Sequence, residues 1–179
     1  TNASLIAANP LIRSLIEGRL LLPPAAPMAD IRQLDAVDMP TSHLIPLDAD
    51  SSQIEALIDA ENGLSFVLSG PPGTGKSQSI TNMIANMLYH GKRVLFVAQK
   101  KDALDVVKER LDKIGLSTFC LELHSNKVDK RYFLSQLQLA VETTHQKAGN
   151  EYETLANQLF IERQKLSAYA DALHKKREH

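Results

Sequence analysis

One octapeptide has the residue types and the spacing to hold phosphate groups: Gly70, Pro71, Pro72, Gly73, Thr74, Gly75, Lys76 and Ser77. It fits the pattern G-x-x-x-x-G-K-[ST], in which glycines let backbone amides approach phosphate oxygens that a side chain would block. Lys76 is expected to reach the β and γ phosphates and to be the catalytic residue, and the hydroxyl of Ser77 is expected to ligate Mg²⁺. The octapeptide therefore predicts a site for a nucleoside triphosphate with Mg²⁺.

The segments on both sides of the octapeptide are those that would position it. The apolar run LSFVLS at 64–69 is typical of a buried strand. A helix is predicted over 77–90, because its apolar residues recur at helical spacing: Ile80, Met83, Ile84, Met87 and Leu88. The beginning of that helix would add its free amides to the site, with Thr74 contributing through its amide and Gln78 counted among the nucleotide contacts. A chance glycine-rich turn is the competing interpretation, which the flanking segments disfavour.

Further along the chain, strands and helices are predicted to alternate. RVLFVA at 93–98 and TFCLEL at 118–123 are predicted to be strands, and apolar residues recur at helical spacing between Asp102 and Gly115. This alternation favours an α/β fold in which helices cover the faces of a parallel sheet. A polar loop and a helix around 130–146 follow.

The last segment has a different pattern. From Tyr152 to Leu173 apolar residues recur at alternating spacings of three and four, as in a heptad seam, with one break at Glu162. A helix over 151–178 would extend roughly 40 Å, which is longer than a compact domain needs. We therefore expect it to project as a stalk and to pack against a partner helix. The alternative is a terminal helix that folds back onto the domain.

These patterns divide the chain into three expected segments. Residues 1–49 form a Pro-rich lead-in that wraps the domain and contains a short apolar helix candidate, PLIRSLIEGRLL. Residues 50–147 form a partial nucleotide-binding domain. Its first helix is predicted within DADSSQIEALIDAENG, where Ser52 and Glu55 have the spacing of a capping box. Residues 150–179 form the helical stalk.

The composition narrows the class of protein. The 179 residues carry a net charge of −1, which does not indicate a globally basic nucleic-acid binder. Cys120 is the only cysteine, so no disulfide can form within the chain, and its expected role is that of a small buried side chain. No run approaches the ~20 apolar residues of a membrane span, and no signal peptide is recognised, so we expect a cytoplasmic protein with no membrane partner. Both ends, Thr1 and KKREH, look cut.

Two further stretches carry candidate binding residues. Gln53 lies 17 residues before Gly70, and its amide could pair with the N6 and N7 edge of adenine; a surface glutamine on a helix is the alternative. Gln99, Lys100 and Lys101 lie at the carboxyl end of the second predicted strand, where open α/β sheets bind ligands. The two lysines could hold a nucleic-acid phosphate there, or they could belong to a solvated turn.

The acidic residue that hydrolysis needs is not recognised. In such proteins it ends a second apolar strand, where it holds Mg²⁺ and positions water, as the Walker B motif does. No run of four apolar residues followed by Asp-Glu occurs after Lys76, and ALIDAE at 56–61 lies before the octapeptide in a helical pattern. This absence disfavours a complete small-molecule kinase and favours a fragment without its acidic motif.

From Asp48 to Val141 the chain resembles superfamily 1 helicases, and specifically the Upf-like group that includes large bacterial proteins. The matching runs are LDADSSQIEALIDAENGLSFVLSGPPGTGKSQSITNMIANML, RVLFVAQKKDALDVVKERL and LELHSNK. The resemblance implies a P-loop NTPase (RecA-like) fold with a parallel sheet, flanking helices and a projecting C-terminal stalk that leads to an inserted subdomain. It also implies that ATP is the nucleotide, with Gln53 at the adenine and Gly70–Ser77 at the triphosphate.

The resemblance also implies contacts to a single strand of nucleic acid, with DNA favoured over RNA. Gln99, Lys100 and Lys101 match the motif that touches the strand. His124 and Ser125 match a family LHS stretch, for which a nucleic-acid contact and a structural loop both remain open.

We therefore expect the ATP-binding amino-terminal part of an ATP-dependent helicase or translocase, with the second motor domain and the other domains of the parent protein outside this sequence. The isolated chain should bind nucleotide weakly and hydrolyse little. Two alternatives remain open: a nucleotide-dependent switch or scaffold whose long helix binds a partner, and an oligomeric AAA-type ATPase.

Overall fold

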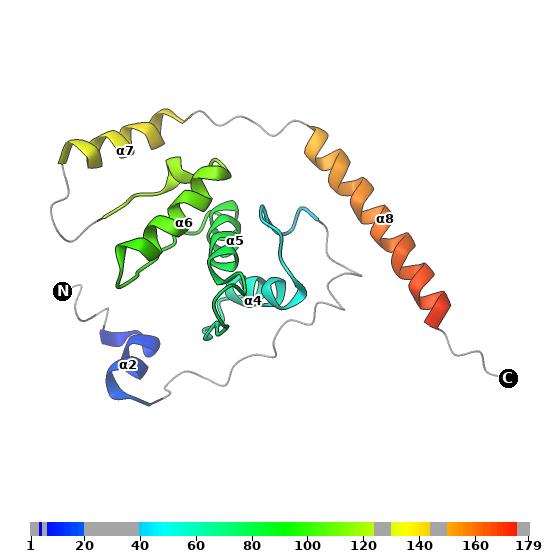
Figure 1. Ribbon diagram of the computed structural model, residues 1–179, viewed down its shortest axis with the longest axis horizontal. Coiled ribbons are helices and arrows are strands. Elements are labelled where there is room, and N and C mark those ends of the chain that lie inside the picture. Colours follow the sequence, from blue (N-terminus) through cyan, green and yellow to red (C-terminus); the bar gives the residue numbers. More distant parts are fainter. Residues whose placement is uncertain (1–3, 5–6, 20–39, 124–129, 144–149, 175–179) are drawn as a thin grey trace.

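The structure is a computed structural model that describes residue 4 and residues 7–19, 40–123, 130–143 and 150–174. The elements that lie within these described ranges are six α-helices and one short 3₁₀ helix: α2 (Pro10–Glu17), α4 (Ser51–Glu61), α5 (Lys76–Tyr89), α6 (Lys101–Lys113), η1 (Ser117–Phe119), α7 (Lys130–Glu142) and α8 (Asn150–His174). Helix α5 is central, because α4 and α6 both pack against it, while α6 and α7 each contact η1 (Figure 1).

Helix α4 begins with a capping box that lies two residues before the expected one. Asp50 is the N-cap, its carboxylate accepts the amide of Gln53, and the Gln53 side chain accepts the amide of Asp50 in return. Ser52, expected as the cap, instead donates its hydroxyl to the Asp50 carboxylate at 2.7 Å. These hydrogen bonds lower the pKa of Asp50, that from Ser52 most strongly. The predicted helix is confirmed, and its start is set by the aspartate.

The small apolar core of the described residues joins α5 to α6. Ile84, Val107 and Leu111 are buried together. Partly buried apolar residues surround them: Ile80, Leu88, Phe96, Ile114, Leu116 and Cys120. Burial of Cys120 raises the pKa of its thiol, so it packs as a neutral side chain, as expected. The helical spacing read from the sequence thus identified the face of α5 that packs on α6.

The opposite face of α5 carries polar side chains that hydrogen-bond to a segment of the lead-in. We call this segment, residues 41–48, the strap. Asn82 accepts the amide of Leu47 at 3.0 Å and donates to its carbonyl at 2.9 Å. Asn86 accepts the amide of Leu44 at 2.8 Å. Both asparagines are at most 1% exposed. A buried amide is costly unless it is hydrogen-bonded, so the contacts with the strap satisfy Asn82 completely and satisfy the side-chain oxygen of Asn86.

The expected parallel sheet is not present, and the α/β prediction of a RecA-like sheet is wrong for this structure. Within the described residues there is no strand: 64–70 and 92–98 have no regular secondary structure, and the third predicted strand overlaps η1. A strand needs a neighbour that completes its backbone hydrogen bonds. An apolar run indicates only that its side chains favour burial. Here even that burial is incomplete, since Val67 is 90% exposed and Leu95 is 86% exposed. All the regular secondary structure of the described residues is helical.

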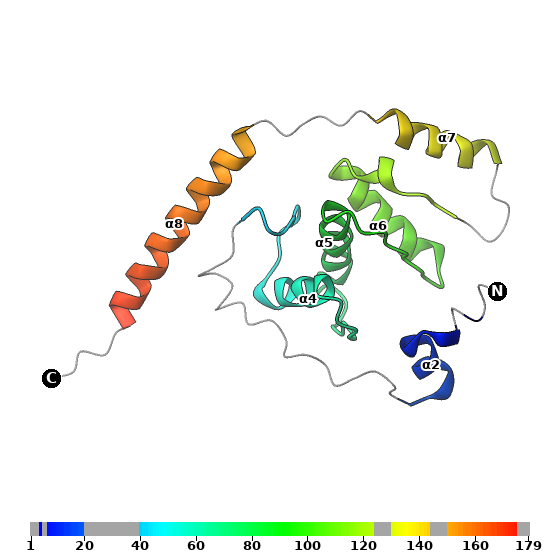
Figure 2. The same cartoon turned by 180° about the vertical axis from the view of Figure 1, so that it is seen from behind.

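The long C-terminal helix is present as α8. None of the other described elements packs against it, and in both views it lies apart from α4, α5 and α6 (Figures 1 and 2). Its heptad residues Leu155, Leu159 and Leu166 are each more than half exposed. A helix folded back onto the other described elements is therefore not observed, while the role of α8 as a stalk stays a prediction.

Other expected elements compare closely with the structure. The apolar helix of the lead-in is α2, with Asn9 as its N-cap, and the helix around 130–146 is α7. The prolines at 23, 24 and 27 lie outside the described residues. None of the helices in the described ranges is sufficiently long and apolar to cross a membrane.

Candidate nucleotide-binding site

The octapeptide forms a tight loop between the segment at 64–70 and α5. Gly73 and Gly75 have φ angles of 86° and 78°, in the left-handed region that favours glycine. Gly70 is required for a different reason, since a Cβ there would lie 2.6 Å from the Thr74 hydroxyl oxygen. That hydroxyl donates to the carbonyl of Pro71 at 2.9 Å. Three glycines of the motif thus serve the loop conformation itself, before any ligand is considered.

The ammonium of Lys76 is held by the loop. Its Nζ donates to the carbonyl of Pro71 at 2.5 Å and also to the carbonyl of Gly70. Lys76 therefore sits as a positive charge at the start of α5, with its stem partly buried. A triphosphate would replace two neutral acceptors by charged ones, which form stronger hydrogen bonds with an ammonium.

The first turn of α5 supplies further donors. Gly75 is the N-cap and no side chain caps the helix, so the first amides, from Lys76 to Gln78, have no intrahelical acceptor. Together with the helix dipole they favour an anion at this end. Among the described residues no group hydrogen-bonds to the Ser77 hydroxyl, while the Ser77 carbonyl accepts from Thr81 at 2.8 Å.

Two polar side chains tie the loop to neighbouring segments. Gln53, on α4, donates from Nε2 to the carbonyl of Thr74 at 3.1 Å, and a Cβ on Gly75 would lie 2.7 Å from the same Nε2. Gln78 donates from its side chain to the carbonyl of Asp48, the last residue of the strap. The structure thus brings Gln53, the octapeptide and Gln78 together, as the predicted nucleotide site requires.

Thr74 and Pro71 make hydrogen bonds within the loop that the sequence did not predict. We expected Thr74 to act through its amide, which here makes only a long hydrogen bond of 3.5 Å to Pro71, whereas its hydroxyl folds back on the loop. The carbonyl of Pro71 accepts from both Thr74 and Lys76. No pattern in the sequence distinguishes this carbonyl, because any residue offers one.

The predicted nucleic-acid residues are only partly described. Lys100 is the N-cap of α6 and Lys101 its first residue, and both lysines, like Gln99, are exposed. No side chain caps this helix, so its first amides are also available. His124 and Ser125 lie outside the described residues.

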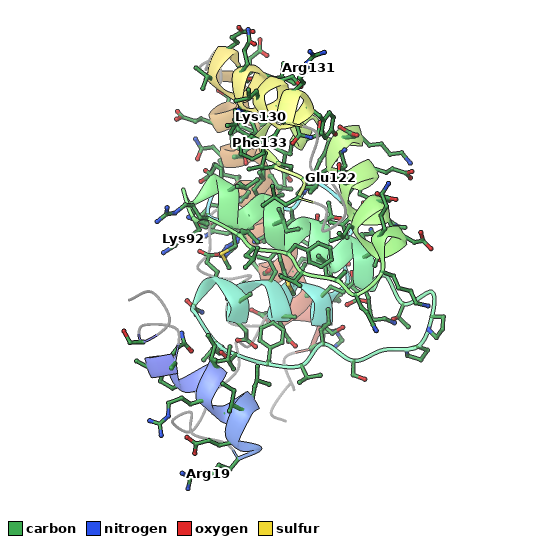
Figure 3. All side chains as sticks on the ribbon, turned by 90° about the vertical axis from the view of Figure 1, so that its left-hand side faces the viewer. Arg19, Lys92, Glu122, Lys130, Arg131 and Phe133 are labelled. Carbon is green, nitrogen blue, oxygen red and sulfur yellow. The ribbon has the colours of Figure 1, made fainter. Side chains whose placement is uncertain are left out.

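A second polar cluster lies away from the loop, between α6 and α7. Lys108 donates to Glu122 at 2.5 Å and to the Tyr132 hydroxyl at 3.3 Å. The carboxylate of Glu122, above all, raises the pKa of Lys108 beyond its ordinary value of 10.5. The amide of Glu122 also donates to Gln136 of α7 at 3.3 Å, and Figure 3 shows Glu122 close to this helix. The cluster fastens α7 to α6 through fully paired charges, which is a structural role.

Comparison with known proteins relates the chain to AAA domains and to ATP-dependent helicases. A family model described as an AAA domain matches residues 48–179. An uncharacterized ATP-dependent helicase of Mycoplasma genitalium is 53% identical over 46 residues, which are 26% of this chain and 4% of that protein. A homologous uncharacterized ATP-dependent helicase of Mycoplasma pneumoniae is 53% identical over 68 residues, 37% of this chain and 6% of that protein. No solved structure matches the chain significantly.

These matches confirm the resemblance to helicases that the motifs indicated. They cover a small share of the two relatives, 4% and 6% of their lengths. The family model includes the octapeptide, Gln53 and α8, but not the lead-in before residue 48.

Proposed function

The chain belongs to the family of AAA domains, and we propose that it is the ATP-binding part of a superfamily 1 ATP-dependent helicase or translocase. The observation that carries the proposal is the loop itself: it joins the ammonium of Lys76 to the uncapped start of α5 through glycines with positive φ angles at 73 and 75. This arrangement suits a triphosphate, because it offers an ammonium, free amides and a helix dipole, and no carboxylate of the described residues pairs with Lys76. The names of the two Mycoplasma relatives support the helicase assignment.

ATP with Mg²⁺ is the proposed ligand. Lys76 would bind the β and γ phosphates, and Ser77, whose hydroxyl has no protein partner among the described residues, would ligate Mg²⁺. Gln53 already uses one donor hydrogen on Thr74 and one acceptor site on Asp50. Since a glutamine amide has two donor hydrogens and two acceptor sites, it keeps one of each for an adenine edge.

The proposed track for nucleic acid begins at α6. Gln99, Lys100 and Lys101 combine exposed positive charge with the free amides of a helix start, which is the arrangement that binds a backbone phosphate. His124 and Ser125 are proposed to extend it. We further propose that the track holds a single strand, DNA rather than RNA, and that the protein works in the cytoplasm, where the lone Cys120 would stay reduced.

The proposal is tested by equilibrium binding of a fluorescent ATP analogue to the 179-residue chain with Mg²⁺, using Lys76→Ala as the blank. We expect saturable binding by the wild type and at least tenfold weaker binding by the variant. The same titration with a labelled single-stranded oligonucleotide should weaken in Lys101→Ala, while Lys113→Ala, at the other end of α6, serves as the matched control. Equal nucleotide binding by the wild type and Lys76→Ala would refute the proposed site.

A hydrolysis assay separates the helicase proposal from a switch. We expect little turnover by the chain alone, because no acidic motif is recognised after Lys76. Turnover stimulated by single-stranded DNA in a longer chain that includes such a motif would support a motor. Nucleotide binding without any such stimulation would favour the switch or scaffold instead.

A further inference from the structure

Three side chains of types that can ligate a metal lie close together at the end of α5 remote from the phosphate loop. His43 belongs to the strap, Glu61 is the last residue of α4, and His90 follows α5 as its C-cap. Nδ1 of His43 lies 2.7 Å from Oε2 of Glu61, and Nε2 of His90 lies 3.1 Å from Oε1 of Glu61. The ligand atoms of all three residues fall within 4.8 Å of one another. The two histidines are 47 positions apart in the sequence, so no local motif indicates that they would lie close together.

The donor set is chemically suited to zinc. Two imidazoles and one carboxylate are a common three-ligand set for Zn²⁺, with bonds of about 2.0–2.2 Å and a fourth position for water. Ligand atoms of a tetrahedral ion with such bonds lie roughly 3.3 Å from one another. The observed 2.7 Å and 3.1 Å contacts, which go to different oxygens of Glu61, would open by a few tenths of an ångström around an ion through small rotations of the partly exposed imidazoles.

The surroundings hold the central carboxylate in place. Asn86, completely buried, donates from Nδ2 to Oε2 of Glu61 at 2.8 Å, while its Oδ1 accepts the amide of Leu44 in the strap. Such an outer hydrogen bond orients a metal ligand. The three side chains are 17% (His43), 23% (Glu61) and 30% (His90) exposed, so an ion and a water molecule can reach them from solvent.

We propose that His43, Glu61 and His90 form a Zn²⁺ site with one open position for water, and that the bound ion fastens the strap to the ends of α4 and α5. The competing interpretation is a set of hydrogen bonds between two imidazoles and one carboxylate without a metal. The site lies about 20 Å from Lys76 along the 14 residues of α5, so it is independent of the proposed nucleotide function.

The test is a Zn²⁺ titration of the complete, tag-free chain by isothermal calorimetry. We expect one ion per chain for the wild type, and affinity at least 100-fold weaker in His43→Ala, His90→Ala and Glu61→Gln, since loss of a direct ligand should exceed the 10–100-fold effect of an outer partner. His174→Ala on α8 is the matched histidine control and should bind like the wild type. A metal-loaded wild type should also melt at a higher temperature, a rise that the ligand variants lose.

Cobalt substitution keeps the proposal testable if a ligand variant fails to fold. Co²⁺ added to the wild type should give the intense visible absorption of a four-coordinate ion, which a hydrogen-bonded triad without metal cannot produce. Absence of stoichiometric Zn²⁺ binding by the folded wild type would overturn the proposal. Undiminished Zn²⁺ binding by folded His43→Ala and Glu61→Gln would overturn it equally, because the ion would then be held elsewhere.

Discussion

The Nε2 atom of Gln53 donates a hydrogen bond to the carbonyl of Thr74 at 3.1 Å, although the two residues are 21 positions apart. The first turn of α4 thereby supports the phosphate loop directly. A side chain expected to recognise a base is thus also part of the loop's framework. Its two roles predict different consequences of mutation.

Gln53→Ala should weaken ATP binding more than GTP binding. Loss of the hydrogen bond to Thr74 loosens the loop for both nucleotides, whereas loss of the remaining donor and acceptor affects only a ligand with an adenine edge. The measurement is competitive binding of both nucleotides, with Gln138→Ala on the exposed face of α7 as the control. Equal losses for ATP and GTP would leave loop support as the sole role of Gln53.

Lys76→Ala should abolish nucleotide binding and leave the fold intact. Within the described residues its ammonium hydrogen-bonds to the loop carbonyls of Gly70 and Pro71, and Pro71 is exposed, so that carbonyl can turn to water when the lysine is removed. Far-ultraviolet circular dichroism and the melting temperature should match those of the wild type and of Lys92→Ala. A collapse of the spectrum would show that Lys76 is a structural residue.

Gly75→Ala should destabilise the loop more than Gly73→Ala. Both residues have positive φ angles, so alanine costs roughly 1–2 kcal/mol at either position. A Cβ at Gly73 meets nothing within 4 Å, whereas one at Gly75 would lie 2.7 Å from Gln53 and must displace it. Urea unfolding and ATP binding of the matched pair measure the difference. Equal stability and equal ATP affinity of the two variants would show that the close approach of Gln53 to Gly75 does not affect the loop.

Asn82→Ala should release the strap. The variant loses both hydrogen bonds to Leu47 and leaves that residue's amide and carbonyl without their partner at a partly buried position, at a cost of about 1–2 kcal/mol. Hydrogen exchange should accelerate at Leu47 and Leu44, with Asn157→Ala on the exposed surface of α8 as the control. Unchanged protection of both amides would mean that apolar contacts alone hold the strap.

Alkaline pH should weaken the attachment of α7. The folded-state pKa of Lys108 is raised by Glu122, so this contribution is complete below the ordinary lysine value of 10.5 and is lost as the pH rises through the higher folded value. The melting temperature of the wild type should therefore fall more steeply above about pH 10.5 than that of Glu122→Gln. At neutral pH the variant should lose about 1 kcal/mol or less, because the lysine is partly exposed. Parallel profiles of the two proteins would contradict the pairing.

Several elements could be read from the sequence because their signals are local. The octapeptide specifies its own turn through Gly73 and Gly75, and apolar spacing located α5 and α6 to within one residue at their starts. The capping box was misplaced by two residues, because Asp50, Ser52 and Glu55 all carry capping side chains and only one arrangement closes both hydrogen bonds. The sheet was predicted wrongly for a related reason: the apolar runs at 64–69 and 93–98 describe side chains, while a strand depends on a backbone partner.

The sequence by itself determined the phosphate loop, the helices and the lone cysteine, since each follows from residue type and spacing over a few turns of chain. Only the tertiary structure decided that Gln53 supports Thr74, that Asn82 and Asn86 hold the strap, and that His43, Glu61 and His90 meet. These contacts join positions that are 18 to 47 residues apart in the sequence. They arise where α4, α5 and the strap pack together, because buried polar groups must find partners wherever the packing places them.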